Sequence, residues 1–302
     1  MTVDPCFAEL LADPRNHVRP LPQSVPLDYA RAAADARLAA APKEPVHSVS
    51  DIAVPAAQGA IACRLYRPEG TDGQPVVVFF HGGGWVWGSL DSHDSVCRSL
   101  AVSSGCAVLS VAYRLSPEAP YPAALEDCLA VLDWVAAHAG DLDLGPGISL
   151  AGDSSGAHLA LATALQSAVP VRHLALFYPP LDPACASASQ QAFAQDHLLT
   201  REGMLWFWDC YRAGKNLPAL LEADLSALPP TSIGLAECDI LHDEGEDLFN
   251  RLRDSGVQAK RRTYPGMIHA FISLPHITPV ARTALHAMGR DIRDALFEEP
   301  PR

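Results

Sequence analysis

The sequence lacks the features of a protein that binds nucleic acid, spans a membrane or is exported. Its formal net charge is −13, so a phosphate backbone or an anionic lipid surface would repel it. No apolar run approaches the roughly 20 residues that a membrane span requires. The first residues, MTVDPCFAELLADPRNH, contain no basic segment followed by an apolar one, and we therefore expect no signal peptide. We expect a soluble, cytoplasmic protein with no nucleic-acid partner and no membrane span.

Cysteine is present but is not arranged as a framework. The eight cysteines are scattered, and none forms a Cys-x-x-Cys pair or a Cys/His cluster. In a chain without an export signal, isolated cysteines of this kind are usually reduced and often buried. This pattern argues against a disulfide scaffold and against a structural zinc site.

The 302 residues, 49% of them hydrophobic, are enough for one large core. Polar and apolar residues alternate over Val46–Val54 and Ala60–Tyr66, which predicts two half-buried strands joined as a hairpin. Continuous apolar runs at Pro75–Phe80, Cys106–Ala112 and Ile148–Ala151 predict strands buried on both faces of a parallel sheet.

The same strand–helix alternation continues to the C-terminus. Further strands are predicted at Val171–Tyr178, Thr231–Glu237 and Val257–Tyr264, and helices at Glu118–Ala137, Ala157–Leu165, His242–Arg253 and from Ala281 onward. This order predicts an α/β fold, with a mostly parallel central sheet and helices on both faces.

Two segments fall outside this rhythm. Residues 1–45 precede the first strand and contain an Ala-rich predicted helix, Asp28–Ala41. Residues 181–225 are too long for a simple crossover and carry a cluster of aromatic side chains. We predict that these two segments form a helical cap, and that residues 46–180 and 226–302 form the α/β core.

The most informative stretch is Gly152-Asp153-Ser154-Ser155-Gly156, which follows a predicted strand and precedes a predicted helix. A Gly-x-Ser-x-Gly sequence at such a junction is typical of a nucleophile elbow. The sharp turn exposes the serine hydroxyl, and glycine fits at the flanking positions because it has no Cβ atom.

Three side chains at predicted strand ends could form a catalytic triad. Ser154, Asp239 and His269 occur in the chain order of the α/β-hydrolase triad, and ligands bind at this edge of a parallel sheet. A serine needs a base to attack at neutral pH, and imidazole titrates in the required range. We predict Ser154 as nucleophile, His269 as base and Asp239 as the carboxylate that orients it. The rival acids Asp153, Asp243 and Glu244 and the rival histidines His242 and His276 have less suitable sequence contexts.

A glycine-rich loop follows the strand that ends at Phe80. The sequence His81-Gly82-Gly83-Gly84 allows the main chain to approach a substrate closely. We predict that the backbone N–H groups of Gly83, Gly84 and Ser155 stabilise the oxyanion, and that His81 braces the loop.

Five motifs together resemble the bacterial hormone-sensitive-lipase-like esterases, over the chain from about Val46 onward. They are HGGGWVWGS (81–89), YRLSPEAPYPAALED (113–127), GDSSG (152–156), DILHDEG (239–245) and YPGMIHAF (264–271). The resemblance implies an α/β-hydrolase fold, a helical cap and a carboxylesterase of short- to medium-chain acyl esters that uses no metal or cofactor. It implies the same six site residues. Departures such as Ser155 and His158, where the family usually has Ala and Asn, remove no functional group.

Two other functions are consistent with the sequence. The same site in an amide or lactone hydrolase, such as an arylformamidase, would use the same residues. A non-catalytic small-molecule receptor on a hydrolase scaffold is the other alternative, although such proteins are expected to lose the serine or the histidine. We also expect that an exposed edge strand allows a homodimer.

Overall fold

The computed structural model describes residues 2–21, 24–68 and 73–297. Within these residues, eight strands form one sheet in the order β1-β2-β4-β3-β5-β6-β7-β8. β1 pairs with β2 and β2 with β4 in antiparallel fashion, and all later neighbours are parallel. The strands are Ser48–Ala56 (β1), Gly59–Arg67 (β2), Gln74–Phe80 (β3), Ala107–Val111 (β4), Leu144–Asp153 (β5), His173–Phe177 (β6), Thr231–Cys238 (β7) and Ala259–Ile268 (β8). The predicted, mostly parallel sheet is confirmed.

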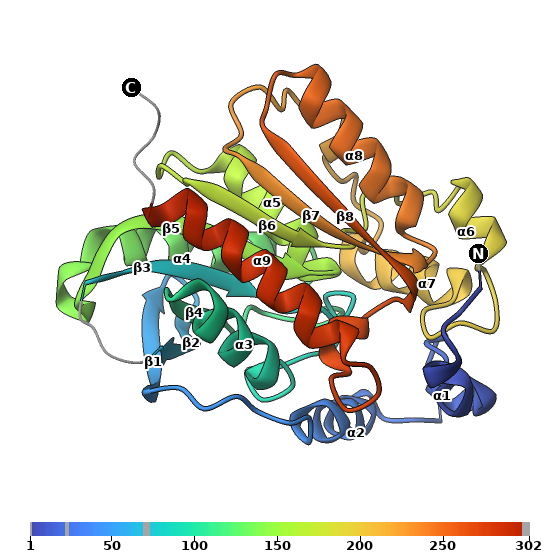
Figure 1. Ribbon diagram of the computed structural model, residues 1–302. Helices are drawn as coiled ribbons and strands as arrows, with labels where there is room; N and C mark the ends of the chain where they lie inside the picture. Colours follow the sequence, from blue (N-terminus) through green and yellow to red (C-terminus); the bar gives the residue numbers. More distant parts are fainter. Residues whose placement is uncertain (1, 22–23, 69–72, 298–302) are drawn as a thin grey trace.

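Helices cover both faces of this sheet, as predicted. Side chains along β3 alternate between two separate cores: Val76, Val78 and Phe80 belong to one, and Val77 and Phe79 to the other. The second core includes residues of α3 and α9, which lie side by side over one face (Figure 1). The helices of the main layers are Asp94–Ser104 (α3), Ala123–His138 (α4), Ser155–Gln166 (α5), His242–Asp254 (α8) and Val280–Phe297 (α9), with short 3-10 turns at Gly140–Leu142 (η3) and Phe271–Ser273 (η5).

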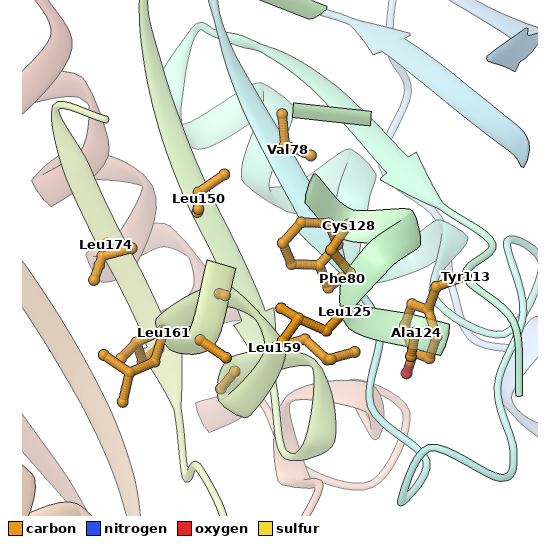
Figure 2. Close-up of a cluster of buried hydrophobic side chains, with 14 of the residues drawn as sticks. Val78, Phe80, Tyr113, Ala124, Leu125, Cys128, Leu150, Leu159, Leu161 and Leu174 are labelled. Carbon is orange, nitrogen blue, oxygen red and sulfur yellow. The ribbon is translucent and has the colours of Figure 1, made fainter. Parts of the chain in front are cut away.

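The first core lies on the α4 and α5 side of the sheet. Figure 2 shows Phe80 of β3 close to Leu125 and Cys128 of α4, with Leu159 of α5 beside them. These side chains are almost completely removed from water. A buried side chain of this size contributes about 1.5–3 kcal/mol through its transfer from water, so this layer stabilises the packing of α4 and α5 on the sheet.

Two elements differ from the sequence prediction. Helix α3 was not predicted, because its sequence DSVCRSLAVSS is rich in serine and valine, which favour helices weakly. It is held in place by burial of Val96, Cys97 and Leu100. Helix α4 begins at Ala123 and not at Glu118, because proline at 122 disfavours helical geometry in the residue before it.

The two segments outside the alternating pattern meet each other. The Val18 N–H group donates to the Leu198 carbonyl oxygen at 2.7 Å, and Thr200 Oγ1 donates to the Val18 carbonyl. Their helices are Pro5–Phe7 (η1), Ala8–Ala12 (α1), Pro14–Asn16 (η2), Leu27–Ala39 (α2), Ala188–Ala192 (α6), Arg201–Arg212 (α7) and Leu220–Glu222 (η4). In the described part of the chain, no helix has the length and apolar character to cross a membrane.

Candidate active site

The turn from β5 to α5 places Ser154 in an unusual backbone conformation. Its φ and ψ angles are 52° and −125°, a region that L-residues adopt only when the surrounding structure imposes it. A Cβ atom on Gly156 would lie 1.9 Å from the Phe80 carbonyl oxygen, so only glycine fits there. The helix and the neighbouring strand therefore approach closely, and the serine projects from the turn between them.

The Ser154 hydroxyl lies at one end of a chain of two short contacts. Its Oγ atom is 3.0 Å from Nε2 of His269, and Nδ1 of the same ring is 2.7 Å from Oδ2 of Asp239. All three residues are buried, with 7%, 8% and 1% of their surfaces exposed. His269 follows β8 and Asp239 follows β7, so the parallel sheet brings them to the same edge as Ser154. Asp239 is further fixed because its Oδ1 accepts the Leu241 N–H at 3.1 Å.

The rival acids have other contacts. Asp243 Oδ2 accepts the Ser189 N–H group, and Glu244 accepts the N–H groups of Leu181 and Asp182. His269 instead hydrogen-bonds to Asp239 and Ser154. Their positions at the start of α8 favour carboxylates for a different reason, since the helix dipole stabilises negative charge there.

The glycine loop lies next to the elbow, with Gly83 and Gly84 both at positive φ. Within the described residues neither N–H group donates a hydrogen bond, so both can bind an oxygen. Ser155 is the first residue of α5, where N–H groups have no partner within the helix. The His81 side chain contacts the loop, as expected: its Nδ1 atom is 2.8 Å from the Gly82 carbonyl oxygen.

Burial and neighbouring groups together shift the pKa values of His81 and Asp153, which lie beside the loop. Burial, reinforced by the nearby His93, lowers the pKa of His81 to about 3, so its ring is neutral at ordinary pH. Burial raises the pKa of Asp153, but His93 and the Gly82 N–H group favour its carboxylate more strongly, and its pKa is lowered overall. His93 was not predicted, because it carries no motif signal of its own and reaches Asp153 only through the fold.

A cavity of about 810 Å³ opens onto Ser154 and His269. Much of its wall comes from residues within 14–21, 25–38 and 198–207, and it is mostly apolar; the apolar side chains include Leu21, Val25, Leu38, Leu199, Met204 and Phe207. Trp87 also lines the cavity, whereas Trp85 is fully buried. Among the described residues, no group of three or more His, Cys, Asp or Glu side chains is placed to hold a metal ion.

A second hollow, of about 960 Å³, lies at the opposite edge of the sheet. It is lined by residues at the amino ends of β6, β7 and β8, including His173, Thr231 and Lys260. None of the six predicted site residues lines it. The cavity above Ser154 is therefore the candidate active site, because ligands of open parallel sheets bind at the carboxyl ends of the strands.

A serine on a strand–helix elbow, with a histidine–aspartate pair from two later strand ends, is the arrangement of the α/β-hydrolase class. Comparison with known proteins agrees. A family model described as alpha/beta hydrolase fold matches residues 77–273, and the chain belongs to that family. This result confirms the resemblance drawn from the sequence motifs.

The similar proteins are esterases. The carboxylesterase NlhH of Mycobacterium tuberculosis is 37% identical over 239 residues, which cover 74% of this chain and 75% of the relative. The ethyl acetate hydrolase of Pseudomonas putida is 33% identical over 254 residues, or 78% and 80% of the two chains. The hyperthermophilic esterase from Pyrobaculum calidifontis superimposes with a TM-score of 0.89 at 34% identity, covering 97% of this chain and 99% of that one.

Proposed function

We propose that the chain is a serine carboxylesterase that hydrolyses short- to medium-chain acyl esters through an acyl-enzyme intermediate. The observation that carries this proposal is the hydrogen-bonded series Ser154–His269–Asp239 at the floor of an apolar cavity. The names of its relatives, which include a carboxylesterase and an ethyl acetate hydrolase, support the same reaction.

In the proposed first step, Ser154 Oγ attacks the ester carbonyl carbon while His269 Nε2 takes the hydroxyl proton. The Asp239 carboxylate accepts a hydrogen bond from the His269 Nδ1–H group and stabilises the imidazolium. The oxyanion would be bound by the N–H groups of Gly83, Gly84 and Ser155, each worth about 3 kcal/mol of barrier lowering. The tetrahedral intermediate then expels the alcohol oxygen, which receives the proton from His269 and leaves the acyl group on Ser154.

The second step repeats this chemistry with water. His269 takes a proton from the water as its oxygen attacks the acyl carbon, and then returns a proton to Ser154 Oγ as the carboxylic acid leaves. The side chains that line the cavity are suited to an acyl chain of limited length. We propose that residues 1–45 and 181–225 form the cap over it, supported by their contact at Val18 and their share of the cavity wall.

The central test is Ser154→Ala. We expect hydrolysis of p-nitrophenyl acetate and butyrate to fall by at least about 10⁴-fold, because the nucleophile is removed, while circular dichroism stays unchanged. Ser167→Ala, at the far end of the same helix, serves as the matched control and should retain full activity. Substantial turnover by Ser154→Ala would refute the assignment.

A panel of substrates tests the alternatives. Acyl esters from acetyl to dodecanoyl, a lactone and an N-formyl arylamine should be compared by kcat/KM with the same enzyme preparation. Faster cleavage of the formamide or the lactone would assign the site to those substrates instead. Tight binding without turnover, and no labelling of Ser154 by a fluorophosphonate, would instead indicate a receptor.

We also propose a homodimer, because β1 and β8 are the two edges of the sheet and each pairs with only one neighbour. Edge strands offer unpaired backbone groups to a second chain. Analytical ultracentrifugation at micromolar concentration should give twice the chain mass of 32.2 kDa. Sedimentation as a single chain would reject the homodimer.

A further inference from the structure

The side chain of Arg31, on helix α2, reaches the far side of the glycine loop. Its Nε atom donates to the Val86 carbonyl oxygen at 2.8 Å, and its Nη2 atom donates to the Ser116 carbonyl at the same distance. Both terminal nitrogens also bind the carboxylate of Glu118, again at 2.8 Å. The guanidinium is therefore held in one orientation by two carbonyls and one bidentate carboxylate.

The two carbonyl groups belong to segments that shape the loop. The N–H groups of Val86 and Trp87 donate to the Gly83 carbonyl oxygen, at 3.1 and 2.8 Å, and so close the turn that contains Gly84. The Ser116 N–H group donates to the Trp85 carbonyl at 2.8 Å, which ties the loop to the following segment. By binding Val86 and Ser116 together, Arg31 completes a ring of hydrogen bonds around residues 83–87.

The opposite side of the loop is fixed by aromatic packing from α7. The rings of Trp85 and Tyr211 stack with their centroids 4.4 Å apart and their planes 9° from parallel. A Cβ atom on Gly84 would lie 2.3 Å from the Phe207 ring. The loop is thus confined between α7 on one side and the Arg31 guanidinium on the other.

Helix α2 lies at the surface, where Leu27 and Leu38 pack against the two cores and Arg37 donates to Asn16 Oδ1 at 2.7 Å. None of its residues is fully buried, and the Arg31 side chain is 17% exposed, much less than its neighbour Asp28 at 95%. The hydrogen bonds from Arg31 are charge-assisted and involve backbone oxygens, so they constrain the main chain directly. An arginine used only to attach this helix could bind surface carboxylates without reaching the loop.

We propose that Arg31 is a positioning residue for the oxyanion loop, so that the N-terminal segment sets the directions of the Gly83 and Gly84 N–H groups. This inference rests on the proposed esterase function. Oxyanion donors act through their fixed placement, and a shift of about 1 Å can reduce the rate by roughly 100-fold. Loss of the guanidinium should therefore lower kcat more than it weakens substrate binding.

The test compares four variants on p-nitrophenyl butyrate. Arg31→Gln should lower kcat about tenfold and change KM less than about twofold, since only the transition state uses the aligned donors. Arg31→Lys should recover part of the loss, because an ammonium can reach one of the two carbonyls. Glu118→Gln keeps the guanidinium and should cost less than Arg31→Gln. Arg251→Gln is the control: it loses a carboxylate contact at Asp247 and a carbonyl contact at Leu221, and neither partner belongs to the glycine loop.

An inhibitor separates positioning from stability. A trifluoromethyl ketone forms an oxyanion on Ser154, and its inhibition constant for Arg31→Gln should rise by the same factor as kcat/KM falls. A lower melting temperature with unchanged kcat and inhibition constant would overturn the inference, as would equal kcat losses in Arg31→Gln and Arg251→Gln. If the unaltered chain cleaved no ester, the proposed function itself would fail, an outcome distinguishable from active wild type with an unaffected Arg31→Gln.

Discussion

The Nε2 atom of His93 lies 3.3 Å from Oδ1 of Asp153, and both side chains are buried. The same carboxylate oxygen accepts the N–H group of Gly82 at 2.9 Å. Asp153 immediately precedes the proposed nucleophile, yet its carboxylate is directed to the glycine loop and not to His269. The elbow and the loop are therefore joined by one buried carboxylate.

Removal of this carboxylate should loosen the glycine loop. We expect Asp153→Ala to lower kcat for p-nitrophenyl acetate by about 100-fold, because the buried Gly82 N–H group loses its acceptor. Asp153→Asn keeps an acceptor oxygen and should lose only about tenfold. Steady-state kinetics on both variants, with melting temperatures measured alongside, check this order. Equal effects of the two substitutions would contradict a role for the hydrogen bond to Gly82.

We expect Asp239 to support catalysis by orienting the His269 imidazole ring. Asp239→Asn should lower kcat/KM by about 10³- to 10⁴-fold, because an amide at 2.7 Å from Nδ1 favours the wrong tautomer of His269. Asp243→Asn, a rival acid that contacts Ser189 instead, should retain most of its activity. A loss of less than tenfold in Asp239→Asn, or a larger loss in Asp243→Asn, would reassign the acid.

The sequence predicted the positions of the site residues that lie at strand ends. Continuous apolar runs located β3, β4 and β5, and the strand–helix alternation located β7 and β8. Residues at the carboxyl ends of parallel strands necessarily share one edge of the sheet. This reasoning brought Ser154, Asp239 and His269 to one place without coordinates, although their catalytic roles stay predictions. The need for glycine at the elbow was also predicted from the sequence, and the structure gives the reason at Gly156, where no space remains for a side chain beside Phe80.

Contacts between segments that are far apart in the sequence could not be predicted from strand ends or motifs. Helix α2 was expected, but nothing in its Ala-rich sequence indicates that Arg31 reaches Val86, which lies 55 residues away along the chain. The aromatic residues of α7 have two different roles that the sequence does not distinguish: Phe207 lines the cavity, whereas Tyr211 packs on Trp85. Side-chain direction on a helix outside the main sheet depends on the partner surface, which the local sequence does not encode.

The close approach of helix α5 to strand β3 at Gly156 leads to a prediction about stability. Gly156→Ala would place a Cβ atom 1.9 Å from the Phe80 carbonyl oxygen, so strand and helix must separate. We expect a loss of about 3 kcal/mol in the free energy of unfolding, measured by urea denaturation. Gly140→Ala is the control, because a Cβ there meets nothing within 4 Å, and it should change stability by less than about 0.5 kcal/mol. Similar stabilities for the two variants would show that the backbone relaxes freely.

A buried carboxylate connects the proposed cap to the catalytic edge of the sheet. Glu244, 3% exposed, accepts the N–H groups of Leu181 and Asp182 through Oε2, and Oε1 accepts from Gln190 Nε2 at 2.9 Å. Burial raises the pKa of Glu244 from 4.5 to about 7, and the three hydrogen bonds offset only part of that effect. The carboxyl group is therefore more easily protonated in the folded protein than in the unfolded chain.

This difference predicts how stability depends on pH. Because the folded pKa is raised, the contribution of Glu244 is fully present below about pH 4.5 and is lost as pH rises through about 7. The loss corresponds to about 3 kcal/mol in the free energy of unfolding. Glu244→Gln cannot ionise, and its amide oxygen still accepts from Leu181 and Asp182 if the Gln190 amide turns over. Urea denaturation at pH 5 and pH 8 should show the wild type losing about 2.5 kcal/mol more than this variant, since a small part of the effect is already lost at pH 5. Parallel pH profiles would mean that Glu244 is ionised at both pH values and that burial does not control its charge.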